Sequence, residues 1–105
     1  MKLIIPSKCQ IGAIKFGIYW NNRLLEKMNL CAYISSKDQK ILLSHRKPDQ
    51  EFCSLIHEAI HGIFNENGMG EDDAEKLVGI LSVGITIFLQ SLGIEPDFSQ
   101  IEEEK

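Results

Sequence analysis

Apolar residues recur every three to four positions through two segments in the second half of the chain. In the first segment they are Phe52, Leu55, Ile56, Ala59, Ile60, Ile63 and Phe64. This spacing is typical of an amphipathic helix. Pro48 and Asp49 form a helix start, and residues 67–70, which include two glycines, end the helix. A second helix is expected to begin at the acidic residues 71–73 and to run to about Leu92, before Gly93 and Pro96.

The first half of the chain has the shorter patterns of strands and turns. Residues 1–20 alternate loosely and contain β-forming residues, so one or two short strands are expected, and residues 21–29 predict a short helix. Residues 30–44 predict a hairpin with arms 31–34 and 39–44 around a turn at 35–38. The fold class is therefore α+β: a small, antiparallel-rich N-terminal sheet followed by two long helices.

The second helix has two apolar lines. The main stripe, which we expect to face the core, consists of Ala74, Leu77, Val78, Leu81, Ile85, Phe88 and Leu92. A second line, Ile80, Val83 and Ile87, lies on another side of the helix. A helix that is apolar on most sides is covered on most sides, so either the sheet or a partner covers this line. A homodimer through this helix is one hypothesis.

Length and charge exclude several classes of protein. The chain has 105 residues, which suits one domain; we expect a single domain over residues 1–96 and an acidic, solvated tail over 97–105. A net charge of −4 argues against a nucleic-acid partner. The longest apolar stretch, 77–92, is interrupted by small and polar residues, so no membrane partner is expected. Three widely spaced cysteines and no signal peptide favour reduced thiols in the cytoplasm.

The first long helix contains the sequence His57-Glu58-Ala59-Ile60-His61. Residues four apart on a helix point about 40° from one another, so the two imidazoles lie on one face and can bind one zinc ion. Glu58 lies on a neighbouring face, where its carboxylate can act as the general base for a water molecule that attacks a peptide carbonyl. Such a short motif also occurs by chance, in which case the histidines only pack or are solvated.

A catalytic zinc ion needs a third protein ligand, and the second helix offers two acids. Glu75 and Glu71 both lie on the flank of its expected core stripe. If the two helices pack antiparallel, Glu75 can approach the histidine pair, and we favour it over Glu71. The simpler interpretation of Glu75 is an acid in the first helical turn, stabilised by the helix dipole.

Four further residues have less specific interpretations. Cys53 precedes His57 by one turn, and could bind the metal or block the site, although it is more simply a buried small residue. His45, Tyr33 and Tyr19 are candidates to stabilise an oxyanion, and each also has a plain structural interpretation.

Residues 55–64 and 75–82 together resemble small phage-encoded metallopeptidase-like proteins, related loosely to minimal gluzincins and to ImmA/IrrE-type metallopeptidases. The hairpin before the helix also fits the layout of these proteins, so the resemblance covers most of the chain. Only the His-Glu-x-x-His segment is specific to them. The resemblance implies a minimal zincin-like fold, a host cytoplasm, and a cleft edge formed by the strand before the helix, here Gln39–Ser44, on which a substrate backbone pairs. Gly79 stands where the family often has an acid.

Three hypotheses follow for the function. The first is a zinc metallopeptidase that hydrolyses a peptide or protein, with Glu58 as base and His57, His61 and Glu75 holding one zinc ion. The second is an inactive relative that binds a partner through the same cleft, for example as a phage regulator. The third is a structural zinc domain, in which the metal holds a small core together.

Overall fold

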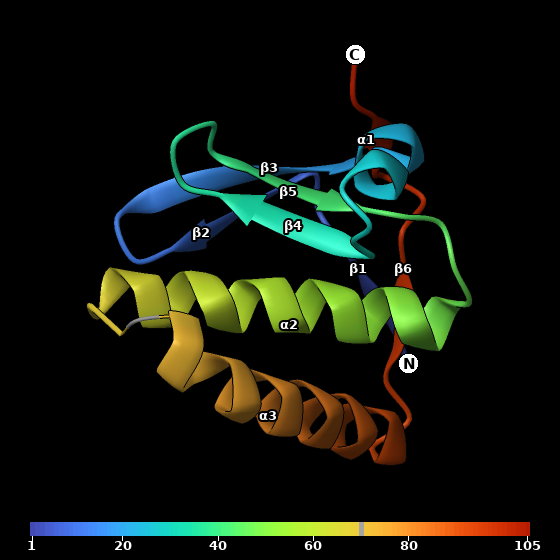
Figure 1. Ribbon diagram of the computed structural model, residues 1–105. Coiled ribbons are helices and arrows are strands. Elements are labelled where there is room, and N and C mark those ends of the chain that lie inside the picture. Colours follow the sequence, from blue (N-terminus) through green and yellow to red (C-terminus); the bar gives the residue numbers. More distant parts are fainter. Residues whose placement is uncertain (70) are drawn as a thin grey trace.

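The computed structural model describes residues 1–69 and 71–105, and the side chains of all of these except residues 71–73. Three layers are stacked: a sheet, helix α2 (Pro48–Glu66) beneath it, and helix α3 (Glu71–Ser91) on the far side of α2 (Figure 1). The short helix α1 (Asn22–Lys27) lies at one end of the sheet. The expected α+β order, a small sheet followed by two long helices, is confirmed.

The main sheet has five strands, in the order β2 (Lys8–Ile11), β3 (Ile14–Trp20), β5 (Lys40–Leu43) and β4 (Ala32–Ser35), with β7 (Glu102–Glu103) also pairing with β3. The β4–β5 hairpin is present as expected. The sheet is mixed, because β3 pairs antiparallel with β2 but in parallel with both β5 and β7. The cause is the connection through α1, which places β4 at the edge and returns β5 beside β3 in the same direction.

Three strands lie where fewer or none were expected. Residues 1–20 form three strands, because β1 (Lys2–Ile4) precedes β2 and β3 and pairs in parallel with β6 (Glu95–Asp97). Residues 97–105 pack on the sheet rather than forming a free tail, although Glu102 and Glu103 are exposed to solvent as expected. Ile101 is 6% exposed and belongs to the main core, and β7 pairs with β3. The apolar side chain of Ile101 and the vacant edge of β3 beside Trp20 hold this segment on the sheet.

The last carboxylate before the C-terminus is also held by the sheet. Glu104 Oε2 lies 2.7 Å from Lys40 Nζ, and Glu104 Oε1 accepts a hydrogen bond of 2.6 Å from the side-chain amide of Asn21. The hydrogen bond from Lys40 is the main reason why the pKa of Glu104 lies below its ordinary value. The acidic residues of this segment are therefore partly structural, and the described chain forms one folded unit to its end.

The core lies between the sheet and α2. Its buried members are Ile5, Ile11, Phe16, Ile18, Trp20, Ile41, Leu43, Phe52 and Ile101. Gly62 lets α2 approach the sheet closely, because a Cβ atom on it would lie 2.9 Å from the Cδ1 atom of Ile34 and 3.0 Å from that of Ile11. The close contact fixes the distance between α2 and β4 and thereby the position of the side chains between them.

Helix α3 packs on α2 through a face that overlaps the expected one only at Ala74 and Val78. Ala74, Val78, Ser82 and Thr86 are buried. The larger members of the expected core stripe are exposed instead: Leu77, Leu81, Ile85, Phe88 and Leu92. Small side chains let two helices approach closely, and the buried hydroxyls bond within their own helix. Ser82 Oγ donates to the carbonyl of Gly79, and Thr86 Oγ1 donates to that of Ser82.

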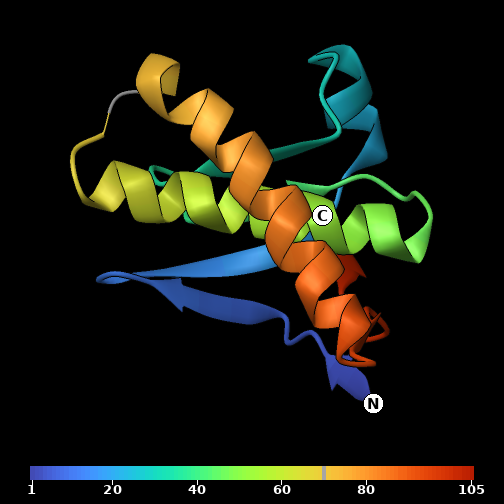
Figure 2. The ribbon, with the colours of Figure 1, turned by 90° about the horizontal axis from the view of Figure 1, so that it is seen from below.

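Because α3 is the outermost layer and touches mainly α2, most of its circumference faces outward (Figure 2). By length and composition alone, residues Ala74–Ser91 could cross a membrane, with a mean hydropathy of 1.3 and 22% of the segment buried. The interruptions noted in the sequence do not prevent this, since small and hydroxyl residues lower the hydropathy of a helix only a little.

Candidate metal centre

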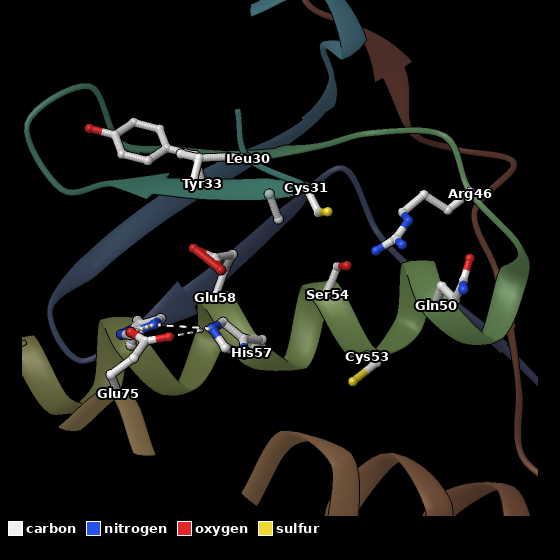
Figure 3. A pocket seen from close by; sticks show the side chains of 12 residues that line it. Leu30, Cys31, Tyr33, Arg46, Gln50, Cys53, Ser54, His57, Glu58 and Glu75 are labelled. Atoms are coloured by element: carbon white, nitrogen blue, oxygen red, sulfur yellow. Dashed lines mark hydrogen bonds and ion pairs between the residues drawn. The ribbon is translucent and has the colours of Figure 1, made fainter. Parts of the chain in front are cut away.

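The motif His57-Glu58-Ala59-Ile60-His61 lies in the middle of α2, as expected. The side chain of His57 points toward Glu75 on α3, whereas that of Glu58 points toward β4 (Figure 3). His61 also reaches α3, because its Nε2 lies 3.1 Å from Glu75 Oε2. The helix begins at Pro48, and a sharp turn with Gly68 at a φ of +76° ends it. There the Met69 N–H donates to the carbonyl of Phe64, a bond typical of a helix C-terminus. The turn brings α3 back beside α2.

Three donor atoms from the two helices converge on one point. His57 Nε2 and His61 Nε2 lie 3.2 Å apart. The two carboxylate oxygens of Glu75 approach them, with Oε1 3.5 Å from His57 Nε2 and Oε2 3.1 Å from His61 Nε2. Together these residues form a group that could hold a metal ion. The alternative ligand Glu71 has a side chain that lies outside the described residues.

The spacing of these atoms is compatible with a tetrahedral metal site. Zinc bonds to imidazole nitrogen and carboxylate oxygen are about 2.0–2.2 Å long, so neighbouring ligand atoms in a tetrahedron lie about 3.3–3.5 Å apart. The separation of the two imidazole nitrogens, 3.2 Å, agrees with that edge to a few tenths of an ångström, and each nitrogen lies 3.1–3.5 Å from a different oxygen of the Glu75 carboxylate. His61 and His57 are partly buried, with side chains 13% and 29% exposed, so the nitrogens are held in place by packing.

A serine on α3 orients the first histidine. His57 Nδ1 lies 3.4 Å from Ser82 Oγ, and Ser82 is 1% exposed. Because the Ser82 hydroxyl donates to the carbonyl of Gly79, its oxygen can accept the Nδ1–H of His57. In that tautomer the Nε2 lone pair of His57 faces the carboxylate of Glu75. Two acceptors in contact repel each other, and a cation between them removes the repulsion.

Ser82 has no assigned role in the sequence reasoning, although the sequence contains a signal for it. It follows Glu75 by seven residues, two helical turns, and therefore lies on the same face of α3. A residue on the face of a candidate metal ligand is a natural partner for the ligands opposite.

The electrostatic surroundings favour the neutral form of His57. Its burial is the main cause that lowers its pKa below the ordinary value, and the neighbouring His61 adds to the effect, while Glu75 opposes it. A neutral imidazole is the form that binds a metal ion.

A cleft of about 520 Å³ opens beside the three donors, between α2 and β4 (Figure 3). His57, His61 and Glu75 line one part of it, and Glu58, which is 8% exposed, lines the wall nearby. Residues 30–33 form the opposite wall. The other end is polar and is lined by Arg46, Gln50 and Ser54, none of which figures in the sequence reasoning.

The remaining sequence candidates are distributed differently. Cys53 and Tyr33 line the cleft, although Cys53 is not part of the metal-binding group. His45 stacks on Trp20, with ring centroids 4.0 Å apart, and lies 3.0 Å from Glu103, so it belongs to the C-terminal end of the sheet. Tyr19 lies over Gly17 on β3 and does not line the cleft. All three cysteines are free.

Replacement of Ser82 by alanine is expected to weaken zinc binding by about 10-fold, since partners of metal-bound histidines are typically worth 10–100-fold in affinity. A competition titration with a chromophoric chelator measures the change. Thr86→Val is the matched control, because it removes a buried hydroxyl one turn away that bonds to the backbone and not to a histidine. Equal affinities for wild type and Ser82→Ala would show that Ser82 only fills space.

Comparisons with protein-family models, with curated proteins and with solved structures give no match for this chain, so its function has to be inferred from the residues of the site.

Proposed function

We propose that this protein is a zinc-dependent metallopeptidase. The observation that carries the proposal is the convergence of His57 Nε2, His61 Nε2 and the Glu75 carboxylate at separations of 3.1–3.5 Å. Two imidazoles and one carboxylate are the ligand set of several catalytic zinc sites, which keep a fourth position open. A structural zinc site usually has four protein ligands, commonly including thiolates, whereas no cysteine belongs to this group.

The ligand set suits the chemistry of amide hydrolysis. A zinc ion held there would lower the pKa of a water molecule toward neutrality and polarise a peptide carbonyl. The chain itself supplies the orientation: Ser82 fixes the ring of His57, and the packing of α3 on α2 fixes the distance from Glu75 to the histidines.

Glu58 is the residue that we propose as general acid and base. It lines the cleft beside the histidines and points toward the opposite wall, where an extended substrate would lie (Figure 3). Its carboxylate would take a proton from the attacking water and deliver it to the leaving amine nitrogen. Burial suits this role, because proton transfers are better controlled where bulk water is excluded.

The wall opposite Glu58 offers a backbone on which a peptide could pair. The strand expected there, Gln39–Ser44, is not at an edge, because β5 pairs with both β3 and β4. Strand β4 is at an edge of the main sheet, and its residues Ala32 and Tyr33 line the cleft. We therefore assign the substrate-binding edge to β4, on which an extended peptide would add as a further antiparallel strand.

The charge at the far end of the cleft suggests which peptides would bind. Arg46 is the one cationic residue among the described side chains that line it. Gln50, beside Arg46, precedes His57 by seven residues of the helix, which corresponds to a distance of about 10 Å along the helix axis. An extended peptide covers this distance in roughly three residues. Strand β4 runs from the Arg46 end of the cleft toward the metal ligands (Figure 3). A substrate that pairs antiparallel with β4 would therefore run from the metal ligands toward Arg46. An acidic residue about three positions after the cleaved bond would then lie beside Arg46.

Mass spectrometry of a diverse peptide mixture incubated with zinc-loaded protein tests the proposal. Cleavage is expected at sites with an acidic residue about three positions on the C-terminal side, and a chelator should stop it. Cleavage without that preference would remove the role of Arg46 and keep the peptidase. No cleavage of any peptide, by protein that contains stoichiometric zinc, would contradict the proposed reaction.

A structural role for the metal has one observation in its favour. Glu75 joins the first turns of α3 to both histidines of α2, and the buried side chains of α3 that pack on α2 are small or medium-sized. A bound ion would therefore also fasten the outer helix. A large fall in the melting temperature upon chelation, with no hydrolytic activity in any assay, would favour this role over catalysis.

A further inference from the structure

The outward face of α3 is apolar along its whole length. Its eight large side chains are each between 39% and 60% exposed: Leu77, Ile80, Leu81, Val83, Ile85, Ile87, Phe88 and Leu92. They comprise the second apolar line of the sequence and the larger members of its main stripe. No charged residue occurs between Lys76 and Glu95. A soluble monomer rarely leaves so large and uninterrupted an apolar surface in contact with water.

The area of this face matches what a stable interface needs. A large apolar side chain presents roughly 200 Å² when it is fully exposed, so eight half-exposed ones present on the order of 800 Å². The largest apolar patch of a typical monomer is about 300–600 Å². A standard protein–protein interface takes about 800 Å² from each partner, so this face alone could supply one side of it.

We propose that a second copy of this chain covers this face, with α3 of one protomer antiparallel to α3 of the other about a two-fold axis. A two-fold interface brings the same patch together with itself, which an uncharged apolar surface tolerates without repulsion. Gly84 lies near the middle of the face, and a Cβ atom on it would meet nothing within 4 Å, so the two helices can approach closely there.

Charges at the two ends of the face fit an antiparallel pair. Lys76 precedes the apolar residues and Glu95 follows them, and both are exposed. In an antiparallel arrangement Lys76 comes near the partner subunit's Glu95, and the two-fold axis repeats the contact. Such rim charges add little energy but favour one orientation of the helices.

A lipid surface fits this face less well, although α3 is apolar enough for a membrane. Helices that lie on membranes carry Lys or Arg along the polar border of their apolar face, where anionic headgroups bind. From residue 77 to residue 104 the chain contains no Lys or Arg, and five acidic residues follow the helix: Glu95, Asp97, Glu102, Glu103 and Glu104. Anionic headgroups would be repelled at that end.

The proposed dimer leaves both clefts accessible. Glu75 lies on the side of α3 that faces α2, about 80° or more around the helix from Ile80, Val83 and Ile87. The cleft itself opens between α2 and β4, away from the outward face of α3. The dimer interface is therefore independent of the proposed peptidase site, and its test does not depend on activity.

Light scattering coupled to size-exclusion chromatography measures the mass of wild type, of Ile80→Glu/Ile87→Glu and of Met28→Glu, at about 10–100 μM. Met28 is the matched control, because it is an exposed apolar residue at the C-terminal end of α1, with 41% of its surface accessible. We expect twice the mass of one chain for wild type and Met28→Glu, and a single chain for the double variant, with unchanged far-UV circular dichroism. A wild type with the mass of one chain, or a double variant that stays dimeric, would overturn the proposal.

A disulfide at the centre of the face gives a second measurement that leaves the apolar side chains intact. Gly84→Cys, in a Cys31→Ser background that removes the exposed native thiol, should form a covalent dimer under mild oxidation. Leu77→Cys in the same background should form far less, since two-fold symmetry places the ends of the face far from their own copies. Monomeric wild type that binds neutral phosphatidylcholine vesicles, and a double variant that does not, would assign the face to a membrane and overturn the dimer.

Discussion

Glu58→Gln is expected to reduce kcat for peptide hydrolysis by about 10²–10⁴-fold, the usual contribution of a general acid or base. The amide keeps the size of the side chain but cannot take a proton from water. Because Glu58 does not belong to the metal-binding group, zinc content should stay that of wild type. Cleavage of one peptide, found in the mixture assay, and elemental analysis of the same sample measure the two quantities together.

Glu51→Gln is the control for this variant. Glu51 and Glu58 are both on α2, and each is 8% exposed, but Glu51 accepts a hydrogen bond from the backbone of Arg46 and lies outside the metal-binding group. Its replacement should leave kcat within about two-fold of wild type. This is a small change in the activation barrier, since a factor of ten in rate corresponds to about 1.4 kcal/mol. An equal loss in both variants would mean that the effect comes from the buried negative charge on α2 and not from proton transfer.

Glu75→Ala is expected to weaken zinc binding by more than about 100-fold. Partners that only orient a ligand are already worth 10–100-fold, and loss of a ligand itself should cost more. The variant should fold as wild type, because the side chain of Glu75 is 62% exposed and fills no part of the core. Isothermal titration with zinc under a competing chelator measures the affinity.

Glu66→Ala is the matched control, since Glu66 is an exposed acid on the last turn of α2, near the turn between the helices. Its zinc affinity should equal that of wild type. Retention of wild-type affinity by Glu75→Ala would move the third ligand elsewhere, with Glu71 the next candidate from the sequence.

The grouping of His57, His61 and Glu75 could be predicted because its signals are local. The spacing of His57 and His61 depends only on the helix, and Pro48 and Gly68 mark the ends of that helix in the sequence. Glu75 follows from one further step, the short turn that makes α3 antiparallel to α2. The family that the sequence resembles often has an acid at the position of Gly79. Its absence leaves the predicted grouping intact, because Glu75 lies one helical turn closer to the connection between α2 and α3 and reaches both histidines.

The orientation of α3 could not be predicted from periodicity. Apolar residues occur on most sides of this helix, so the pattern does not show which line faces α2. The buried line includes Ser82 and Thr86, whose hydroxyl groups bond to carbonyls of their own helix. Their burial therefore costs little, and polarity in the sequence gives the wrong signal.

The C-terminal strands were missed for a related reason. Residues 102–104 are all glutamate, which predicts a solvated segment when each residue is considered alone. A two-residue strand needs only backbone hydrogen bonds, and the edge of β3 beside Tyr19 and Trp20 supplies them. Pairing over such a distance in the sequence depends on the assembled sheet, and no local pattern records it.

Zinc X-ray absorption on tag-free wild-type protein, with elemental analysis of the same sample, tests the central claim most directly. We expect about one zinc ion per chain and a first shell of nitrogen and oxygen at about 2.0–2.2 Å, with imidazole scattering from two histidines. No bound zinc after the metal is supplied, or a sulfur atom at about 2.3 Å in the first shell, would contradict a site formed by His57, His61 and Glu75.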